Sequence, residues 1–377
     1  MNLLIPNLGS TSLKYQVVEM PSETVRGKGR IERVSDYREA IARIGTEGAR
    51  IDAIALKAVH AGPAYRGTFL VDDGVVAALR QFLPAAPAHN AIYLTAIEAF
   101  REAMPGVPIV AAFEPEFHAT VPEYARLYGV PESWLQEGVE RYGFHGASHQ
   151  YVAERVAAML GKEARLVSCH LGGSSSMCAI DRGRSIDTTM GFSPQSGLEN
   201  ATRHGDLDVF AVLYMMERHG WSPREVRAQL AKEGGLAGLS GVAGGDVRDL
   251  ESAAGQGNRR AELALAVFTY QVKKTIGAFA AAMGGLDAVA FTGGIGENSA
   301  RLRAACCAGL EFLGIELDRQ RNEAGSGDRV VSAGNSRVTV LALATNEELI
   351  VARRAWKCLQ AAGQSGPQEA SVTGNGG

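Results

Sequence analysis

Short apolar runs and longer amphipathic runs alternate along most of the chain. Apolar runs of strand length predict buried β-strands at residues 3–6, 15–18, 53–60, 109–113, 165–170, 288–292 and 338–343. Between them, apolar positions recur at helical spacing, which predicts helices at residues 36–44, 91–104, 149–160, 207–219, 259–283 and 346–360. Strands that alternate with helices in this way are typical of α/β architecture.

The last predicted helix carries the signals of a helix start. Thr345 is a preferred N-cap residue, and Glu347 and Glu348 place negative charge in the first turn. Beyond this helix, residues 363–377 are small, polar and rich in glycine. Such a composition predicts a disordered tail.

The first two strands flank a turn rich in hydrogen-bonding groups, with the sequence NLGSTSLK at residues 7–14. This region repeats, because LLIPNLGSTSLKYQVVE aligns with LVSCHLGGSSSMCAIDR, so that Gly9 matches Gly172 and Ser12 matches Ser175. The match is short enough for chance to explain it. Each copy nevertheless begins a long α/β segment, as expected of a duplicated two-domain protein.

A third glycine turn, at residues 292–298, lies between a predicted strand and a helix. It matches neither GxGxxG nor GxxxxGK[ST], and taken alone it is explained as a tight strand-to-helix turn. Together the three turns fit one ligand, a nucleoside triphosphate in a cleft between two domains. Exposed amide and hydroxyl groups hold phosphate oxygens, and a lysine neutralises their charge.

Composition narrows the class of protein. A chain of 377 residues predicts two domains, and its net charge of −3 argues against nucleic-acid binding. Neither a membrane-spanning apolar stretch nor a signal peptide is expected. The five cysteines show no metal-ligand spacing, so we expect reduced thiols and a cytoplasmic protein.

Five segments together resemble the acetate kinase family. They are NLGSTSLKYQVVE, YGFHGASHQYV, CHLGGSSSMCAIDRGRSIDTTMGFSP, FTGGIGENS and TNEEL, in the family's order along the chain. The resemblance implies the duplicated actin-like fold of the actin/sugar-kinase/Hsp70 superfamily, with ATP between two domains. It implies phosphate transfer between ATP and a short carboxylate to give an acyl phosphate, with Mg²⁺ (or Mn²⁺ as an alternative) and a homodimer.

Mapped onto this chain, the resemblance places an N-terminal domain at residues 1–150, joined by the C-terminal helix at 345–362. A nucleotide-binding domain follows at residues 151–344. Asn7 and Glu347 match the magnesium positions. The expected ATP-binding residues are Ser10, Ser12, Lys14, His170, Leu171, Gly172, Gly173, Ser174, Asp246, Val247, Arg248, Gly294, Ile295, Gly296, Glu297 and Asn298.

Three residues match the family's catalytic positions: Glu114, His145 and Arg203. A metaphosphate-like transition state spreads negative charge over its equatorial oxygens, so a guanidinium and an imidazolium across it accelerate transfer. Outside this context, His145 reads as a capped core histidine and Arg203 as a surface ion-pair partner. The expected carboxylate-binding residues are Lys57, Val59, Ala88, Phe144 and Pro194.

The chain departs from the family pattern at four of these positions. Glu114 replaces an aspartate, Lys57 an arginine, Gly173 an asparagine and Ala88 a leucine. Lys57 gives up the bidentate grip of a guanidinium on a carboxylate. Ala88 is expected to enlarge the pocket, which favours a substrate bulkier than acetate.

Two hypotheses follow from the sequence. The first is an active ATP-dependent kinase for a short carboxylate. The second is a catalytically weakened homologue that binds nucleotide and acts as a sensor or partner protein. Retention of the charged residues Lys14, His145, Arg203 and Glu347 favours the first.

Overall fold

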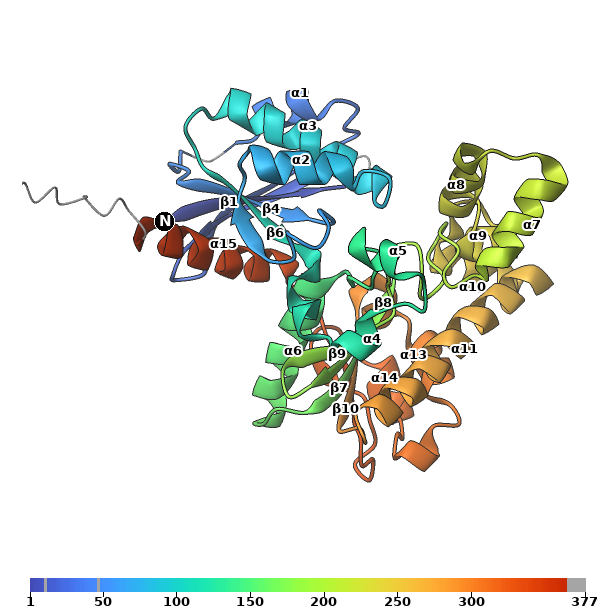
Figure 1. Cartoon of the computed structure of the whole chain (residues 1–377). Helices are drawn as coiled ribbons and strands as arrows, with labels where there is room; N and C mark the ends of the chain where they lie inside the picture. The colour runs from blue at the N-terminus through green and yellow to red at the C-terminus, as the bar shows by residue number, and fades with distance from the viewer. Residues whose placement is uncertain (10–11, 46–47, 365–377) are drawn as a thin grey trace, which may run out of the picture. The chain divides into compact units, whose positions relative to one another are not determined.

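The computed structural model describes residues 1–9, 12–45 and 48–364 (Figure 1). Contacts divide the chain into two compact units, Met1–Phe113 with the chain from Glu348 on, and Glu114–Glu347. The sequence placed the boundary near residue 150, and that domain assignment stays a prediction. No helix in the described ranges is long and apolar enough to cross a membrane.

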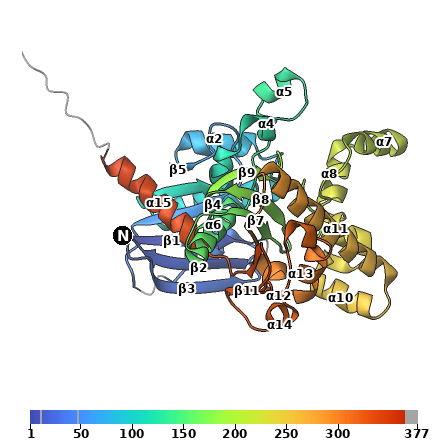
Figure 2. The same cartoon turned by 90° about the horizontal axis from the view of Figure 1, so that it is seen from below.

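The first unit is built on a six-stranded mixed sheet with the order β3-β2-β1-β4-β6-β5. Strands β1, β2 and β3 form an antiparallel meander, seen side by side in Figure 2. Strand β4 runs parallel to both β1 and β6, and β5 lies antiparallel to β6 at the edge. The strands are β1 (Asn2–Leu8), β2 (Ser12–Glu19), β3 (Thr24–Glu32), β4 (Ala53–Ala58), β5 (Thr68–Leu70) and β6 (Ile109–Phe113).

Helices cover both faces of this sheet. Helices α1, α2 and α3 pack on one face and α15 lies on the other (Figure 1). Because both faces are covered, β4 and β6 are buried along nearly their whole length, which explains their continuous apolar sequences. The helices are α1 (Tyr37–Ala42), α2 (Asp73–Gln81), α3 (Pro87–Ala103) and α15 (Glu347–Gln364).

Several elements of this unit differ from the prediction, and β5 and α2 were not predicted. Strand β3 was not predicted, because TVRGKGRIE has two glycines and three basic residues, and its side chains lie largely at the surface. Helix α15 ends at Gln364, two residues into the segment expected to be a tail. Residues 365–377 lie outside the described part of the chain.

The second unit repeats the strand connectivity of the first. Its sheet has the order β11-β12-β10-β7-β8-β9. An antiparallel meander (β7, β8, β9) is again followed by parallel strands (β10, β12) and an antiparallel edge strand (β11). The repeat seen in the sequence therefore corresponds to a duplicated α/β fold, and the fold class is confirmed. The strands are β7 (Arg165–His170), β8 (Ser176–Asp181), β9 (Arg184–Thr188), β10 (Ala288–Thr292), β11 (Arg329–Val330) and β12 (Thr339–Ala342).

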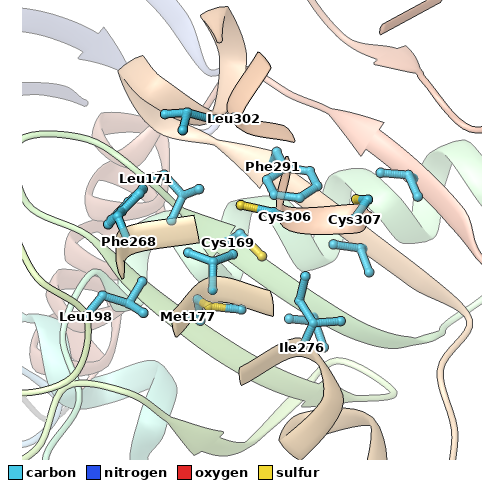
Figure 3. Packing of buried hydrophobic residues seen from close by; sticks show 14 of the residues in the cluster. Cys169, Leu171, Met177, Leu198, Phe268, Ile276, Phe291, Leu302, Cys306 and Cys307 are labelled. Carbon is cyan, nitrogen blue, oxygen red and sulfur yellow. The ribbon is translucent and has the colours of Figure 1, made fainter. Parts of the chain in front are cut away.

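The core of the second unit lies between this sheet and its helices. Helix α11 packs its apolar side on one face, where Cys169, Met177, Phe268 and Phe291 meet (Figure 3). Helix α6 covers the other face. The helices are α4 (Glu123–Arg126), α5 (Glu132–Gln136), α6 (Gly146–Leu160), α7 (Val209–His219), α8 (Pro223–Lys232), α9 (Gly235–Ser240), α10 (Val247–Gly255), α11 (Arg259–Ala282), α12 (Gly293–Asn298), α13 (Ala300–Cys307) and α14 (Arg319–Glu323), with 3₁₀ helices η1 (Glu114–Thr120), η2 (Ala243–Gly245) and η3 (Glu311–Leu313).

Phe268→Ala is expected to lower the free energy of unfolding of this unit by about 3–5 kcal/mol. The Phe268 ring is fully buried in the core, so its removal loses apolar burial and leaves a cavity. Chemical denaturation followed by circular dichroism measures the change. Phe312→Ala is the matched control, because that ring is 73% exposed, and its effect should stay within about 0.5 kcal/mol. Equal effects of the two substitutions would contradict this core assignment.

Candidate active site

The turn between β7 and β8 is held in place by backbone contacts. The Leu171 amide donates to Thr292 O at 2.8 Å, and Leu171 O accepts from Ile295 N at 2.9 Å. Gly293 follows β10 with φ of +76°, and a Cβ atom there would lie 2.6 Å from Leu171 O. Only glycine fits this conformation and this close approach. The glycine turns after β7 and β10 are therefore fitted directly to each other.

A second set of contacts joins the β7–β8 turn to a glycine pair. The Ala201 amide donates to Gly173 O at 3.0 Å. Gly245 has φ of +64°, and a Cβ atom there would lie 2.1 Å from Ala201 O. Asp246 follows as the N-cap of α10, because its carboxylate accepts from Arg248 N at 2.9 Å. The Arg248 side chain also donates to this carboxylate and lowers the pKa of Asp246.

These three segments surround a pocket of ≈ 740 Å³ in the second unit. Eight residues expected to bind ATP line it, from all three segments. They are Gly172, Gly173, Asp246, Val247, Arg248, Gly294, Ile295 and Asn298. The other lining residues, which the sequence analysis missed, are Ala201, Gly244, Gly245, Glu251 and Ser299. Of these, only the pair Gly244–Gly245 gives a signal in the sequence, because adjacent glycines indicate that the backbone can approach a ligand or another segment closely.

Other expected ATP residues lie beside the pocket without lining it. Leu171 is buried under the turn, and His170 and Ser174 flank it. Gly296 is buried in α12. Glu297 is half-buried, and its burial raises the pKa of the carboxyl.

Arg303 is a buried residue that the sequence analysis did not single out. Its guanidinium donates to Gly296 O at 2.8 Å and Glu297 O at 2.9 Å, and to Asn322 Oδ1 through Nε at 2.8 Å. Burial lowers the pKa of Arg303 to about 10. These hydrogen bonds hold the C-terminal end of α12, whose residues Gly294, Ile295 and Asn298 line the pocket. A single arginine inside a helix gives no sequence signal for that role.

The start of α6 carries His145 and contacts Glu114. His145 is the N-cap residue, in a left-handed conformation with φ of +56°. A Cβ atom on Gly146 would lie 2.0 Å from Glu114 O, so the backbone of η1 touches the first turn of α6. Glu114 is 3% exposed, and its Oε2 accepts from Ala147 N at 3.3 Å. A carboxylate at a helix N-terminus is favourably placed.

The His145 ring is held from two sides. Its Nδ1 forms a hydrogen bond of 2.8 Å with Ser176 Oγ. The ring also stacks on His170, with ring centroids 4.2 Å apart and planes at 19°. His170 Nδ1 in turn lies 2.7 Å from Ser148 Oγ. His145 is therefore half-buried and oriented, with contacts to both β7 and β8.

Arg203 and Pro194 lie together on the segment after β9. Arg203 Nη1 donates to Pro194 O at 2.7 Å. Burial lowers the pKa of Arg203 to about 10. The side chain is thus partly desolvated, in contrast to the surface ion-pair reading. Phe144, another expected substrate residue, is buried, and its carbonyl contacts His118 Nε2 at 3.1 Å.

In the first unit, Asn7 and Lys14 are cross-strand partners on β1 and β2. Asn7 Nδ2 donates to Glu348 Oε1 at 3.0 Å, next in sequence to the expected metal residue Glu347, which begins α15. Lys14 is exposed. Ser12 begins β2, and its carbonyl accepts from the Gly9 amide at 2.9 Å. Ser10 lies outside the described residues.

The expected carboxylate-binding residues of the first unit lie on or near two elements. Lys57 is half-buried near the end of β4, and Val59 is buried just beyond it. Ala88 lies in the first turn of α3. Across residues 1–9, 12–45 and 48–364, no group of three or more His, Cys, Asp or Glu side chains is arranged to hold a metal ion. The expected metal site has one such side chain, Glu347, together with the amide of Asn7, so a search for groups of three does not test it.

The chain is similar to proteins of known kind over nearly its whole length. The Acetokinase family matches residues 34–353. An acetate kinase of Caldanaerobacter subterraneus is 41% identical, over 94% of this chain and 98% of its own. An acetate kinase of Methanosarcina acetivorans is 39% identical, over 94% and 96%.

Solved structures agree with these relatives. Porphyromonas gingivalis acetate kinase superposes with a TM-score of 0.84 at 33% identity, covering 95% of this chain and 99% of its own. A propionate kinase from Francisella tularensis gives 0.87 at 30% identity, covering 94% and 98%. With the glycine-lined pocket between the turns after β7 and β10, these matches show that the chain belongs to the acetokinase family.

Proposed function

We propose that this protein phosphorylates a short-chain carboxylate with ATP to give an acyl phosphate and ADP, reversibly. The observation that carries the proposal is the pocket in which the turns after β7 and β10 and the Gly244–Gly245 pair converge. Backbone amides at such glycine turns suit phosphate and nucleotide groups. Relatives about 40% identical are acetate kinases, and nothing in the comparisons favours a catalytically weakened binding protein.

The chemistry is an in-line displacement at the γ-phosphorus. One carboxylate oxygen of the substrate forms the new P–O bond while the bond to the β-phosphate oxygen breaks and ADP leaves. The substrate is already ionised at neutral pH, so its attack needs no general base. His145 and Arg203 are proposed to donate hydrogen bonds to the equatorial oxygens as charge spreads over them. Glu114, at the α6 N-terminus, is proposed to orient the reacting groups.

The remaining site residues are assigned by the same reasoning. Lys57, Val59, Ala88, Phe144 and Pro194 are proposed to bind the carboxylate. Ser10, Ser12 and Lys14 are proposed as further ATP-binding residues. The pocket residues and their neighbours in the second unit are proposed to bind the rest of ATP.

Asn7 and Glu347 are proposed to bind Mg²⁺, with Mn²⁺ as an alternative. Mg²⁺ in nucleotide sites takes oxygen ligands, commonly one or two carboxylates together with substrate phosphates. The donor set fits, because Asn7 Nδ2 is engaged by Glu348, which directs the amide so that Oδ1 is its oxygen for a cation. The ion, when bound, neutralises charge on the phosphate oxygens.

A homodimer is proposed from an apolar surface on α7. Four of its neighbouring apolar residues are exposed: Val209 (62%), Phe210 (74%), Leu213 (44%) and Tyr214 (56%). Apolar side chains gathered on one exposed helix are typical of a protein–protein contact. A second copy of this chain, presenting the same face, is the proposed partner.

A cytoplasmic location is proposed from the thiols. Cys169, Cys178, Cys306 and Cys307 are buried outside any disulfide. Burial raises the pKa of Cys307 to about 12 and also raises the pKa of Cys178, so both thiols stay protonated. Buried cysteines outside disulfides suit a reducing compartment.

Arg203→Ala is expected to lower kcat by about 10²–10³-fold while changing the KM for ATP little, because its donor acts on charge that develops during transfer. Trapping the acyl phosphate with hydroxylamine measures the rate. Arg184→Ala, at an exposed position on β9, is the control and should leave turnover unchanged. Near-native turnover of Arg203→Ala would show that the role assigned to this residue is wrong.

Ala88→Leu is expected to shift the substrate preference toward acetate. Each added methylene in such a pocket is worth about a 10–200-fold discrimination, and an alanine in place of a leucine at this position is proposed to admit a longer acid. The ratio of kcat/KM for acetate and butyrate on both proteins decides the point. Ala103→Leu, at the exposed end of the same helix, should leave the ratio unchanged. A native enzyme that uses acetate best, and whose ranking Ala88→Leu does not alter, would exclude the enlarged pocket.

Phe210→Asp is expected to convert the dimer to monomers, because a charge would be buried in an apolar contact. Sedimentation velocity measures the oligomeric state. Phe312→Asp is the control, since that ring is as exposed (73%) as Phe210 (74%) but lies on η3. A dimer that survives Phe210→Asp would remove α7 from the interface.

A further inference from the structure

A buried chain of alternating serine and histidine side chains runs behind His145. His145 Nδ1 is 2.8 Å from Ser176 Oγ, and the same oxygen is 2.8 Å from His149 Nε2. His149 Nδ1 is 2.9 Å from Ser168 Oγ. This series of side chains therefore links the half-buried imidazole of His145 to the interior of the second unit through three hydrogen bonds.

All three residues that continue the series beyond His145 are buried. Ser168, Ser176 and His149 are each 0% exposed. Ser168 lies on β7 and Ser176 on β8, while both histidines lie one helical turn apart at the start of α6. The link thus ties the first turn of α6 to the sheet, at the point where the backbone of His145 adopts its left-handed conformation.

The direction of each hydrogen bond in this serine–histidine series depends on where the protons lie. The Ser176 hydroxyl has one proton and lies between two ring nitrogens, so it donates to one and accepts from the other. Burial lowers the pKa of His149 well below its usual value, so this ring is neutral and has one donor and one acceptor. A neutral His149 whose Nδ1 accepts from Ser168 donates through Nε2 to Ser176. Ser176 then donates to Nδ1 of His145.

We propose that Ser176 and His149 are positioning residues that hold the neutral His145 ring as its Nε2–H tautomer, so that Nε2 donates to the transferring phosphoryl group. This inference rests on the kinase function proposed above. In this arrangement Nδ1 of the neutral His145 ring accepts a hydrogen bond, so the ring proton lies on Nε2, and each buried hydroxyl and ring nitrogen of the link has a partner.

Other titratable groups surround this chain. The His118 ring, from η1, lies 5.7 Å from the His149 ring, and the His170 ring, from β7, lies 6.5 Å from it. His170 also stacks on His145, and the Glu114 carboxylate, from η1, accepts from Ala147 N at the start of α6. Cys178, on β8, is 3.9 Å from His118 Nδ1. Positive charge on His118 or His170 disfavours a charge on His149, which keeps this link neutral.

The hydrogen bond between Ser185 and His118 is a matched control for the one between Ser176 and His145. His118 Nδ1 is 2.9 Å from Ser185 Oγ, and Ser185 is also 0% exposed. Ser185→Ala therefore removes the same kind of buried hydroxyl–imidazole hydrogen bond without touching His145. Any difference between Ser176→Ala and Ser185→Ala reports the link to His145 and not the general cost of a buried serine.

Ser176→Ala is expected to lower kcat by about 10–100-fold, as when a metal-ligating histidine loses its outer hydrogen-bond partner, with the KM values for ATP and carboxylate little changed. Ser185→Ala should keep near-native kcat, and Ser176→Thr, which keeps the hydroxyl, should recover most of the loss. Equal effects of Ser176→Ala and Ser185→Ala on kcat would overturn the proposal.

The tautomer provides a test that does not depend on activity. In protein labelled with ¹⁵N-histidine, the neutral His145 ring, assigned by the signal lost in His145→Gln, should show its proton on Nε2. In Ser176→Ala the ring should become a mixture of both tautomers. A native His145 with its proton on Nδ1 would overturn the proposal even if Ser176→Ala fails to fold. Absence of kinase activity in the native protein would instead count against the proposed function, while the tautomer still decides this inference.

Discussion

The carbonyl oxygen of Leu171 organises the second unit's pocket. It accepts from the amides of Ile295 (2.9 Å) and Gly296 (3.2 Å), and the Leu171 amide donates to Thr292 O. These contacts bring the turn after β7 against the first residues of α12. They require Gly293, since any Cβ atom there would collide with the same carbonyl. Arg303 secures the other end of α12, so the pocket wall is fixed at both ends before a ligand arrives.

The duplicated sheet explains why the functional groups lie where they do. Both meanders begin with a strand that is followed in the sequence by glycine and serine residues, after Leu8 in one unit and after His170 in the other. In the second unit the turn after β7 lines a pocket, and the start of α6 holds His145 against Ser176 of β8 and donates from Ala147 N to the Glu114 carboxylate of η1.

Much of this arrangement was predictable from the sequence, because it depends on local signals. Buried strands such as β4, β6 and β10 are continuous apolar runs, and the repeat of the first turn predicted the duplication. Eight pocket residues were identified from the resemblance to the acetate kinase family, five of them in glycine-rich turns. Strand β3 was missed because its polar, glycine-containing sequence gains order by pairing with β2, a tertiary effect. Ala201 was missed for the same reason, since its importance comes from backbone contacts with Gly173 and Gly245, which are distant in sequence. Arg303 was missed because an arginine inside a helix gives no local signal of burial.

The contact between Gly146 and the backbone of Glu114 bears on how this protein can change. The collision at 2.0 Å involves the carbonyl oxygen of Glu114, which every residue at position 114 would share. The main chain there is consequently fixed whatever the side chain, and position 146 is closed to all residues but glycine. Exchange between glutamate and aspartate at position 114 then changes only how far the carboxylate extends from a fixed main chain. Evolution, or a protein engineer, can adjust that reach without disturbing the helix that carries His145.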